Sequence, residues 1–257
     1  MKWVGADLFI REIYHMKKIL LIALVACLGG IMTNSLQAQT NIQYHYMVGK
    51  HFYKELNHAD TPANIMTLEH ISGDKWGNNY LFADFTMGAG NLQNVYMQIQ
   101  RDTKFWKAPI YLHLEYHGGV ARGCKVAFNH SYLGGLSWSY VNSKQPAFVS
   151  LAMSYKYDQG WDQPHNMSLL TSWSWTSWNR LWTLSGFARL NTQKLEGVKS
   201  GVNFVTEPQC WLNINQFAGV PDDFRLSIGT EVKMSYSMVA PDRFYVLPTV
   251  AAKWTFK

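Results

Sequence analysis

The stretch FRLSIGTEVKMSY, residues 224–236, alternates between apolar and polar side chains at every step. Its apolar face includes Leu226 and Ile228, and its polar face carries Arg225 and Lys233. Side chains point to opposite sides of a strand with a period of two, so this pattern predicts a β-strand. Strands of soluble sheets average about five or six residues, whereas a tilted strand that crosses a bilayer needs roughly 9 to 11. The segment is therefore typical of a strand that crosses a lipid membrane.

The same alternation recurs along most of the chain. In AFVSLAMSYKY, residues 147–157, one face carries Val149, Leu151 and Met153 and no charged side chain. Twelve strands are predicted, over residues 41–50, 62–72, 79–88, 93–102, 109–118, 130–141, 147–157, 165–176, 181–192, 201–213, 224–236 and 244–256. Pro208 inside the tenth strand is expected to mark an edge or a bulge, because proline cannot donate to a sheet ladder. An aromatic content of 15% also favours β structure.

The predicted strands leave few ways to fold. Beyond the N-terminal segment, no stretch approaches the 18 consecutive apolar residues of a membrane helix, and open sheet edges are not tolerated in lipid. Bacterial outer-membrane barrels have even strand numbers. The sequence therefore predicts an all-β protein, a single antiparallel transmembrane β-barrel of about twelve strands, with ten or fourteen as alternatives. A soluble β-sandwich is disfavoured because the clearest strands carry no charge on the apolar face, although His70 and Arg101 have that parity in weaker strands.

The N-terminal segment predicts a leader. From Met16 onward, MKKILLIALVACLGGIMTNSLQAQT has two lysines, an apolar run and a small residue, Ala38, before the polar part begins. This is the pattern of a secretory signal peptide. Residues 1–15 have no place in such a leader, so Met16 is the expected start. We expect residues 1–38 to be this over-extended signal peptide and residues 39–257 to be the barrel.

Cysteines and charge exclude several classes of protein. Cys27 lies in the leader, in a short box that resembles a lipoprotein cleavage site, and that alternative stays open. Cys124 and Cys210 are too few for a disulfide framework and are not spaced as a zinc site, so both are expected to be free thiols. The formal net charge of +6 includes a basic leader, and no basic stripe or nucleic-acid motif is present. We therefore expect no nucleic-acid partner.

Connection lengths and tryptophans suggest an orientation. If both chain ends lie in the periplasm, long outer loops should alternate with short inner turns. The long connections are 50–61, 119–129, 158–164 and 193–200, the short ones include 142–146 and 177–180, and the exceptions are 89–93, too short, and 214–223, too long. In TSWSWTSWNRLW, residues 171–182, four tryptophans surround one turn, as in an interfacial aromatic girdle.

Several segments resemble a known family. The chain ends in AAKWTF before Lys257, which resembles the aromatic-terminated last strand that the outer-membrane assembly machinery recognises in Gram-negative bacteria; the final lysine departs from that pattern. Four further segments carry a family resemblance: TLEHISGDKWGNNYLFADF (67–85), LHLEYHGGV (112–120), FVTEPQCWLNI (204–214) and LPTVAAKWTF (247–256). They resemble an uncharacterised outer-membrane family of the Bacteroidetes, which is distantly similar to the nucleoside-specific channel-forming porins. The resemblance implies a twelve-stranded barrel.

The polar strand faces supply the candidate site residues, because they should line the lumen if the apolar faces meet lipid. The ionisable candidates are Glu69, Asp84, His113, Glu115, Lys156, Arg189, Glu207, Arg225, Glu231, Lys233 and Lys253. The aromatic candidates of the same parity, suited to stacking on a planar ring such as a base, are Tyr80, Phe82, Tyr111 and Trp211. In so small an interior some charges must pair, and acidic residues of early strands with basic residues of late strands would narrow the pore.

Two other kinds of site, a metal centre and an esterase site, are disfavoured by the sequence. His113, Glu115 and His117 share one strand face, but three ligands on one strand reach a single ion poorly, so no metal and no cofactor are expected. His70 and Ser72 also share a face, as a barrel-type lipid esterase would require. No orienting acid is evident beside them, and no enzyme is expected.

The resulting hypothesis is an outer-membrane channel for small hydrophilic solutes, with nucleosides the best candidate by resemblance. Its expected partners are the outer-membrane bilayer, the barrel assembly machinery and the solute. The alternative is a closed outer-membrane barrel with a structural, adhesive or lipid-ester hydrolase role. A barrel of twelve strands lies near the size at which side chains can fill the interior, so charge pairing across the lumen decides between the two.

Overall fold

In the computed structural model, the described residues are 38–256 without 59–60, 89–90, 122–129, 143–145 and 194–198. The expected leader, apart from Ala38, and Cys124 lie outside the described residues. The elements are β1 (Ala38–Met47), η1 (Val48–Phe52), β2 (Asn64–Asp74), β3 (Gly77–Gly88), β4 (Asn91–Thr103), β5 (Ile110–Ala121), β6 (Ser131–Asn142), β7 (Ala147–Asp158), β8 (His165–Thr176), β9 (Trp182–Thr192), β10 (Val202–Thr206), β11 (Gln209–Asn213), η2 (Ile214–Gln216), β12 (Leu226–Tyr236) and β13 (Phe244–Thr255).

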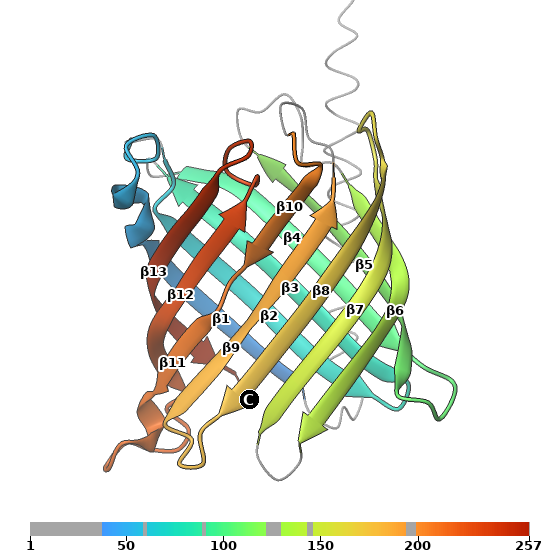
Figure 1. Cartoon of the computed structure of the whole chain (residues 1–257). Coiled ribbons are helices and arrows are strands. Elements are labelled where there is room, and N and C mark those ends of the chain that lie inside the picture. The colour runs from blue at the N-terminus through green and yellow to red at the C-terminus, as the bar shows by residue number, and fades with distance from the viewer. Residues whose placement is uncertain are drawn as a thin grey trace, which may run out of the picture.

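The strands close into one barrel (Figure 1). Consecutive strands pair antiparallel from β1 to β9, β12 pairs with β13, and β13 pairs back with β1, with Ile42 opposite Trp254. β10 and β11 each pair with both β9 and β12, so together they occupy one place in the wall. The thirteen strand segments thus form a twelve-stranded barrel, which confirms the predicted fold class.

The interruption between β10 and β11 is caused by Pro208. Proline has no N–H group, so the ladder cannot continue through it. Its carbonyl oxygen still accepts a hydrogen bond from the Val232 N–H of β12 at 3.0 Å, and the N–H of Glu207 donates to the Phe187 carbonyl oxygen of β9 at 3.0 Å. The irregularity expected at Pro208 is therefore a local break inside one continuous wall position.

The barrel is polar inside and apolar outside. Its fully buried side chains include Gln43, His113 and Ser235, whereas large apolar side chains such as Leu136 and Met153 are exposed. This is the reverse of a soluble protein and matches a barrel whose outer band meets lipid while its interior is polar. Among the described residues, no helix is long and apolar enough to cross a membrane. The protein spans the membrane with its strands, as outer-membrane barrels do.

The predicted strand boundaries hold to within a few residues, and the first strand differs most. It covers Ala38–Met47 rather than 41–50, because the chain turns into η1 at Val48. Gly49 then lies so close to the Leu247 backbone of β13 that an added Cβ would overlap it. Since β1 no longer runs beside this end of β13, the Tyr53 hydroxyl takes its place and accepts the Val246 N–H at 2.9 Å.

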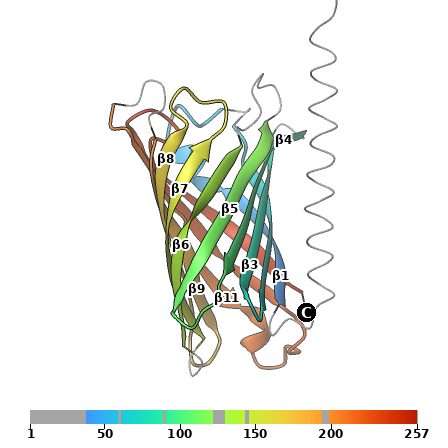
Figure 2. The same cartoon turned by 90° about the vertical axis from the view of Figure 1, so that its right-hand side faces the viewer.

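The two mouths of the barrel differ. We call the mouth at which β1 begins and β13 ends the terminal mouth, and the opposite one the loop mouth (Figure 2). At the loop mouth β3 and β4 are separated by only two residues, whereas residues 214–225 form a long terminal-mouth connection that contains η2. Both predicted exceptions to the alternation of loop lengths are thus present. Trp178, in the turn after β8, is 76% exposed at the terminal mouth.

Candidate functional site

The alternation of the strands places the predicted lumen residues on the inward face. Buried polar side chains mark that face, such as Asn41 in β1 and His113 in β5, and cross-strand partners point to the same side of a sheet. Asn41 stands opposite Glu69, and His113 opposite Asp102. The predicted residues placed inward are Glu69, Tyr80, Phe82, Asp84, Tyr111, His113, Glu115, Lys156, Arg189, Glu207, Trp211, Glu231, Lys233 and Lys253.

Arg225 is placed differently from the prediction. The strand predicted over 224–236 begins only at Leu226, so Arg225 belongs to the connection before β12. Its carbonyl oxygen accepts the Thr255 N–H at 3.1 Å, beside the end of β13. The side chain lines a cavity at the terminal mouth rather than the middle of the lumen.

Glu115 is the centre of a buried ionic cluster. Arg189 donates to both of its carboxylate oxygens, Nη2 to Oε1 at 2.6 Å and Nη1 to Oε2 at 3.1 Å. His117 Nε2 lies 2.8 Å from Oε1, and His113 Nε2 lies 3.2 Å from Oε2. The Glu115 side chain has no exposed surface. A buried carboxylate with this many polar partners is satisfied in the way that a low-dielectric interior demands.

This cluster bridges the lumen. Glu115 belongs to β5 and Arg189 to β9, and β6, β7 and β8 lie between them in the wall. Arg189 is also fixed by Ser168 of β8, which accepts a hydrogen bond from Nη1 at 3.1 Å. The ion pair is therefore a crossbar inside the barrel, between strands that do not touch.

A second acid extends the cluster along the wall. Asp102 of β4 accepts a hydrogen bond from Ser137 of β6 at 2.6 Å and from Gln100 at 2.9 Å. His113 Nδ1 lies 2.8 Å from the same carboxylate, so this imidazole bridges Asp102 and Glu115. The second nitrogen of a histidine ring, when bonded in this way, fixes the orientation of the first.

Two further ion pairs lie along the inward faces. The Lys233 ammonium of β12 is 2.8 Å from Glu207 at the strand break, and Lys156 is 2.8 Å from Asp158 of its own strand β7. Glu231, next along the inward face, accepts a hydrogen bond from Gln209 at 2.7 Å. Each cation thus stands beside a carboxylate, which offsets the cost of removing charges from water.

Aromatic side chains occupy another sector of the lumen. The Tyr80 and Phe82 rings are stacked at 6.5 Å and 13°, and Phe82 meets Tyr96 edge-on at 6.3 Å. Trp211 is fully buried, and the Lys253 ammonium lies over its ring at 4.2 Å from the centroid. Offset stacking and cation–π geometry of this kind stabilise rings packed in an interior.

Tyr111 stands apart from this sector, near the terminal mouth. Its ring carries the ammonium of Lys104 at 4.6 Å from the centroid. Tyr111 lies opposite Ser137 of β6, on the inward face.

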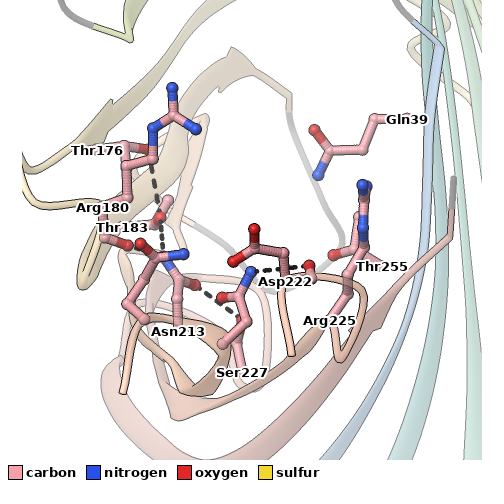
Figure 3. A pocket seen from close by; sticks show the side chains of 11 residues that line it. Gln39, Thr176, Arg180, Thr183, Asn213, Asp222, Arg225, Ser227 and Thr255 are labelled. Atoms are coloured by element: carbon pink, nitrogen blue, oxygen red, sulfur yellow. Dashed lines mark hydrogen bonds between the residues drawn. The ribbon is translucent and has the colours of Figure 1, made fainter. Parts of the chain in front are cut away.

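A polar cavity of about 530 Å³ opens at the terminal mouth, and we call it the vestibule (Figure 3). It is bounded by the first residues of β1 and the last of β13, by the turn between β8 and β9, and by the connection 214–225. Its lining residues are Gln39, Thr176, Arg180, Thr183, Asn213, Asn215, Gln216, Asp222, Arg225, Ser227 and Thr255.

The residues considered for a metal centre and for an esterase site lie on opposite faces of the barrel wall. No group of three or more His, Cys, Asp and Glu side chains suited to a metal ion occurs within the described residues. Instead, both His113 and His117 are bonded to the Glu115 carboxylate. On the outward face, the His70 ring lies 2.8 Å from the Thr40 hydroxyl, and Ser72 is buried.

Several inward residues were missed by sequence reasoning. His45 of β1 lies edge-on to Trp211 at 6.1 Å, Asp102 and Asp158 hold buried partners, and Tyr96 extends the aromatic sector. All four have the inward parity of their predicted strands, with Asp158 one residue beyond its predicted boundary. Parity applied to every polar or aromatic residue would have found them.

Comparisons with known proteins agree with the barrel. A solved NanC porin matches with a TM-score of 0.51 and 10% identity, covering 85% of this chain and 99% of that one. A KdgM porin matches with a TM-score of 0.48 and 8% identity over 85% and 99% of the two chains. At 10% identity, the similarity to the NanC porin is a similarity of fold. A search among curated protein sequences gives no match. One family model matches residues 38–256, nearly all of the described barrel. The chain belongs to that family, described as a domain of unknown function (DUF5020).

Proposed function

We propose that the protein is an outer-membrane channel that passes small hydrophilic solutes through its lumen. The observation that carries the proposal is the closed barrel with an apolar outer face and an inward face of charged and hydroxyl side chains, among them Lys156, Arg189 and Ser235. A barrel that served only as an anchor would not require ionisable side chains inside, where each must be paired at a cost. In a channel the same side chains set selectivity.

The channel we propose is narrow. The Glu115–Arg189 crossbar spans part of the lumen between β5 and β9, and the Trp211 ring is buried beside β12 and β13. A solute would pass along the remaining inward surface, between the crossbar and the aromatic sector. Such a path excludes large solutes and favours flat or small ones.

Nucleosides are the finer proposal for the solute. It is supported by the distant sequence resemblance to nucleoside-specific channels and by inward aromatic rings. Trp211 and Tyr111 already carry lysine ammonium groups on their rings, so Tyr80 and Phe82 are the better candidates for stacking on a base.

The same proposal places the protein in its cell. The terminal mouth would face the periplasm, after cleavage of a leader and insertion by the barrel assembly machinery of a Gram-negative bacterium of the Bacteroidetes. Phe256, directly after the last strand, would serve as the aromatic recognition signal.

The test is planar-bilayer recording together with liposome swelling, with uridine, glucose and a large oligosaccharide as solutes. We expect conductance, and swelling with uridine and glucose only. Lys233→Ala and Glu207→Ala remove one inward pair and should change conductance, whereas Lys54→Ala in an outer loop is the matched control and should not. Absence of both conductance and swelling would favour the alternative, a closed barrel with a structural, adhesive or lipid-ester hydrolase role. Conductance that Lys233→Ala and Glu207→Ala both leave unchanged would keep the channel and discard these lining residues.

A further inference from the structure

Two arginines of the vestibule differ from the cations deeper in the lumen. Arg180 lies in the turn between β8 and β9, and Arg225 lies before β12. Ion pairs occur at Lys156, Arg189 and Lys233 deeper in the lumen, but neither vestibule arginine forms one with any residue that the structure describes. Figure 3 shows both guanidinium groups beside the same open space. A pair of unneutralised guanidinium groups at one cavity is the arrangement that binds anions.

The backbone holds both arginines in place. Arg180 adopts a left-handed conformation with φ 56°, and its N–H donates to the Ser177 carbonyl oxygen at 2.8 Å. Its own carbonyl oxygen accepts a hydrogen bond from the Asn213 side chain at 2.7 Å. Arg225 is fixed through its carbonyl oxygen by Thr255 at the end of β13. Each guanidinium therefore projects from a fixed point, which lowers the cost of ordering it around a ligand.

The Asn213 side chain is occupied by hydrogen bonds within the vestibule wall, so ligand binding falls to other groups. Its amide donates to the Arg180 carbonyl oxygen and, at 3.0 Å, to the Thr183 hydroxyl, and its oxygen accepts the Ser227 hydroxyl at 2.8 Å. Gln39, at the start of β1, forms no side-chain hydrogen bond within the described part of the chain and faces the same space (Figure 3). The groups free to bind thus include two cations and a neutral amide.

One acidic side chain opposes them. Asp222 lines the vestibule between the two arginines, and within the described residues it forms an ion pair with neither. Just inside, Lys253 stands opposite Ser227 of the vestibule wall, with its ammonium over the Trp211 ring. The positive charges therefore continue inward, and Asp222 is the group that an incoming anion must overcome.

From this arrangement we infer that the vestibule binds the carboxylate or phosphate group of a small hydroxylated solute and makes the channel prefer anions. The inference rests on the proposed function and refines its solute class. Arg180 and Arg225 bind the anionic group, Gln39 donates to it or to a neighbouring hydroxyl, and Asp222 limits the affinity so that the solute leaves again.

The first test is ion selectivity in bilayers of phosphatidylcholine, which carries no net charge and supplies no competing anion. We expect the reversal potential in a KCl gradient to show a preference for chloride. Arg180→Gln and Arg225→Gln should each lower the chloride-to-potassium permeability ratio about threefold at 0.1 M salt, since one charge is lost at a few ångströms in water. Asp222→Asn should raise the ratio by a similar factor.

The matched control removes two positive charges from the same end of the barrel. Lys75 and Lys107 lie in other terminal-mouth connections, outside the vestibule, and their replacement by glutamine should leave the ratio unchanged. Arg180→Lys keeps the charge and separates loss of charge from damage to the turn. Heat-modifiable gel mobility shows that each variant is folded.

The second test is direct binding in a neutral detergent, by titration calorimetry with glucose, gluconate and glucose 6-phosphate. We expect binding of the two anions but not of glucose, and its loss in the Arg180→Gln/Arg225→Gln variant. Binding of gluconate alone or of the phosphate alone identifies the anionic group. Conductance with a permeability ratio equal in this variant and in the lysine control would overturn the inference and leave the channel standing. If the native protein does not conduct, the proposed channel fails, and the inferred anion site then stands or falls with the calorimetry.

Discussion

Breaking the Glu115–Arg189 crossbar is the strongest test of the lumen architecture. The pair is buried, bidentate and bonded on its acidic side to two histidines. Arg189→Gln leaves the Glu115 carboxylate with the histidines alone, and Glu115→Gln leaves a buried guanidinium with only Ser168 among its former partners. The double variant removes both charges at once.

The expected magnitudes follow from burial. Removing one partner of a buried ion pair typically destabilises a protein by about 3 to 5 kcal/mol, because the other charge remains uncompensated. We expect Glu115→Gln near the upper end, since it strands a permanent cation, and Arg189→Gln near the lower end, since His113 and His117 still bond the carboxylate. The double variant should cost less than the sum of the two by at least about 2 kcal/mol.

The assay is equilibrium unfolding in urea, followed by tryptophan fluorescence of protein refolded into short-chain phosphatidylcholine vesicles. The same preparations are used for single-channel recording, in which Arg189→Gln should raise the conductance because a long side chain no longer crosses the lumen. Lys54→Gln, in the connection between η1 and β2 at the loop mouth, is the control for removal of a positive charge.

Additive unfolding free energies would refute the reasoning. If the coupling between the two substitutions is below about 0.5 kcal/mol, the two side chains do not interact across the barrel in the membrane. Unchanged conductance in Arg189→Gln would show that the crossbar does not restrict the path, even if the coupling is large.

Three other predictions follow from particular positions. Met153 is 61% exposed on the outer face of β7, so Met153→Arg should destabilise the folded barrel in vesicles by about 2 to 4 kcal/mol. Phe52 in η1 is 64% exposed, and Phe52→Arg should cost less than about 1 kcal/mol. Equal costs of the two substitutions in urea titrations would contradict a lipid-facing β7. Gly135→Ala should lower the urea midpoint of unfolding, because the added Cβ would overlap the Met153 carbonyl oxygen. The neighbouring Gly134→Ala should leave the midpoint nearly unchanged, because the nearest atom to its added Cβ is 3.9 Å away. Equal midpoints for the two variants would refute the close approach of β6 and β7. The pKa of the Glu55 carboxyl lies below its ordinary value of 4.5, because the backbone N–H of Glu55 and then the hydroxyl of Tyr245 donate to it. The contact of this loop with β13 should therefore persist above pH 4.5 and weaken as the pH falls through the lowered pKa. Hydrogen exchange of the η1 segment at pH 6 and pH 3.5 should show this loosening, and Glu55→Gln should abolish the pH dependence.

The order of the residues was enough to predict the strands and the direction of their side chains. Period-two alternation is a local property, so residues 165–176 were predicted with the boundaries that the structure has. The same parity placed Glu115, Arg189 and Lys233 on the inward face. Pro208 likewise announced the break between β10 and β11, because a missing N–H group acts where it stands.

Which inward charges meet could not be predicted in this way, because it depends on the closed barrel. Glu115 and Arg189 are 74 residues apart in sequence, and three strands lie between theirs in the wall. Their contact depends on the stagger and curvature of the closed barrel, which no local pattern encodes. The vestibule also depends on tertiary structure: Arg180 and Arg225 come from separate connections on either side of β11, and closure of β13 on β1 adds Gln39 to the same cavity. Alternation fixes the side of the wall on which a side chain lies, but barrel closure fixes its neighbours across the lumen.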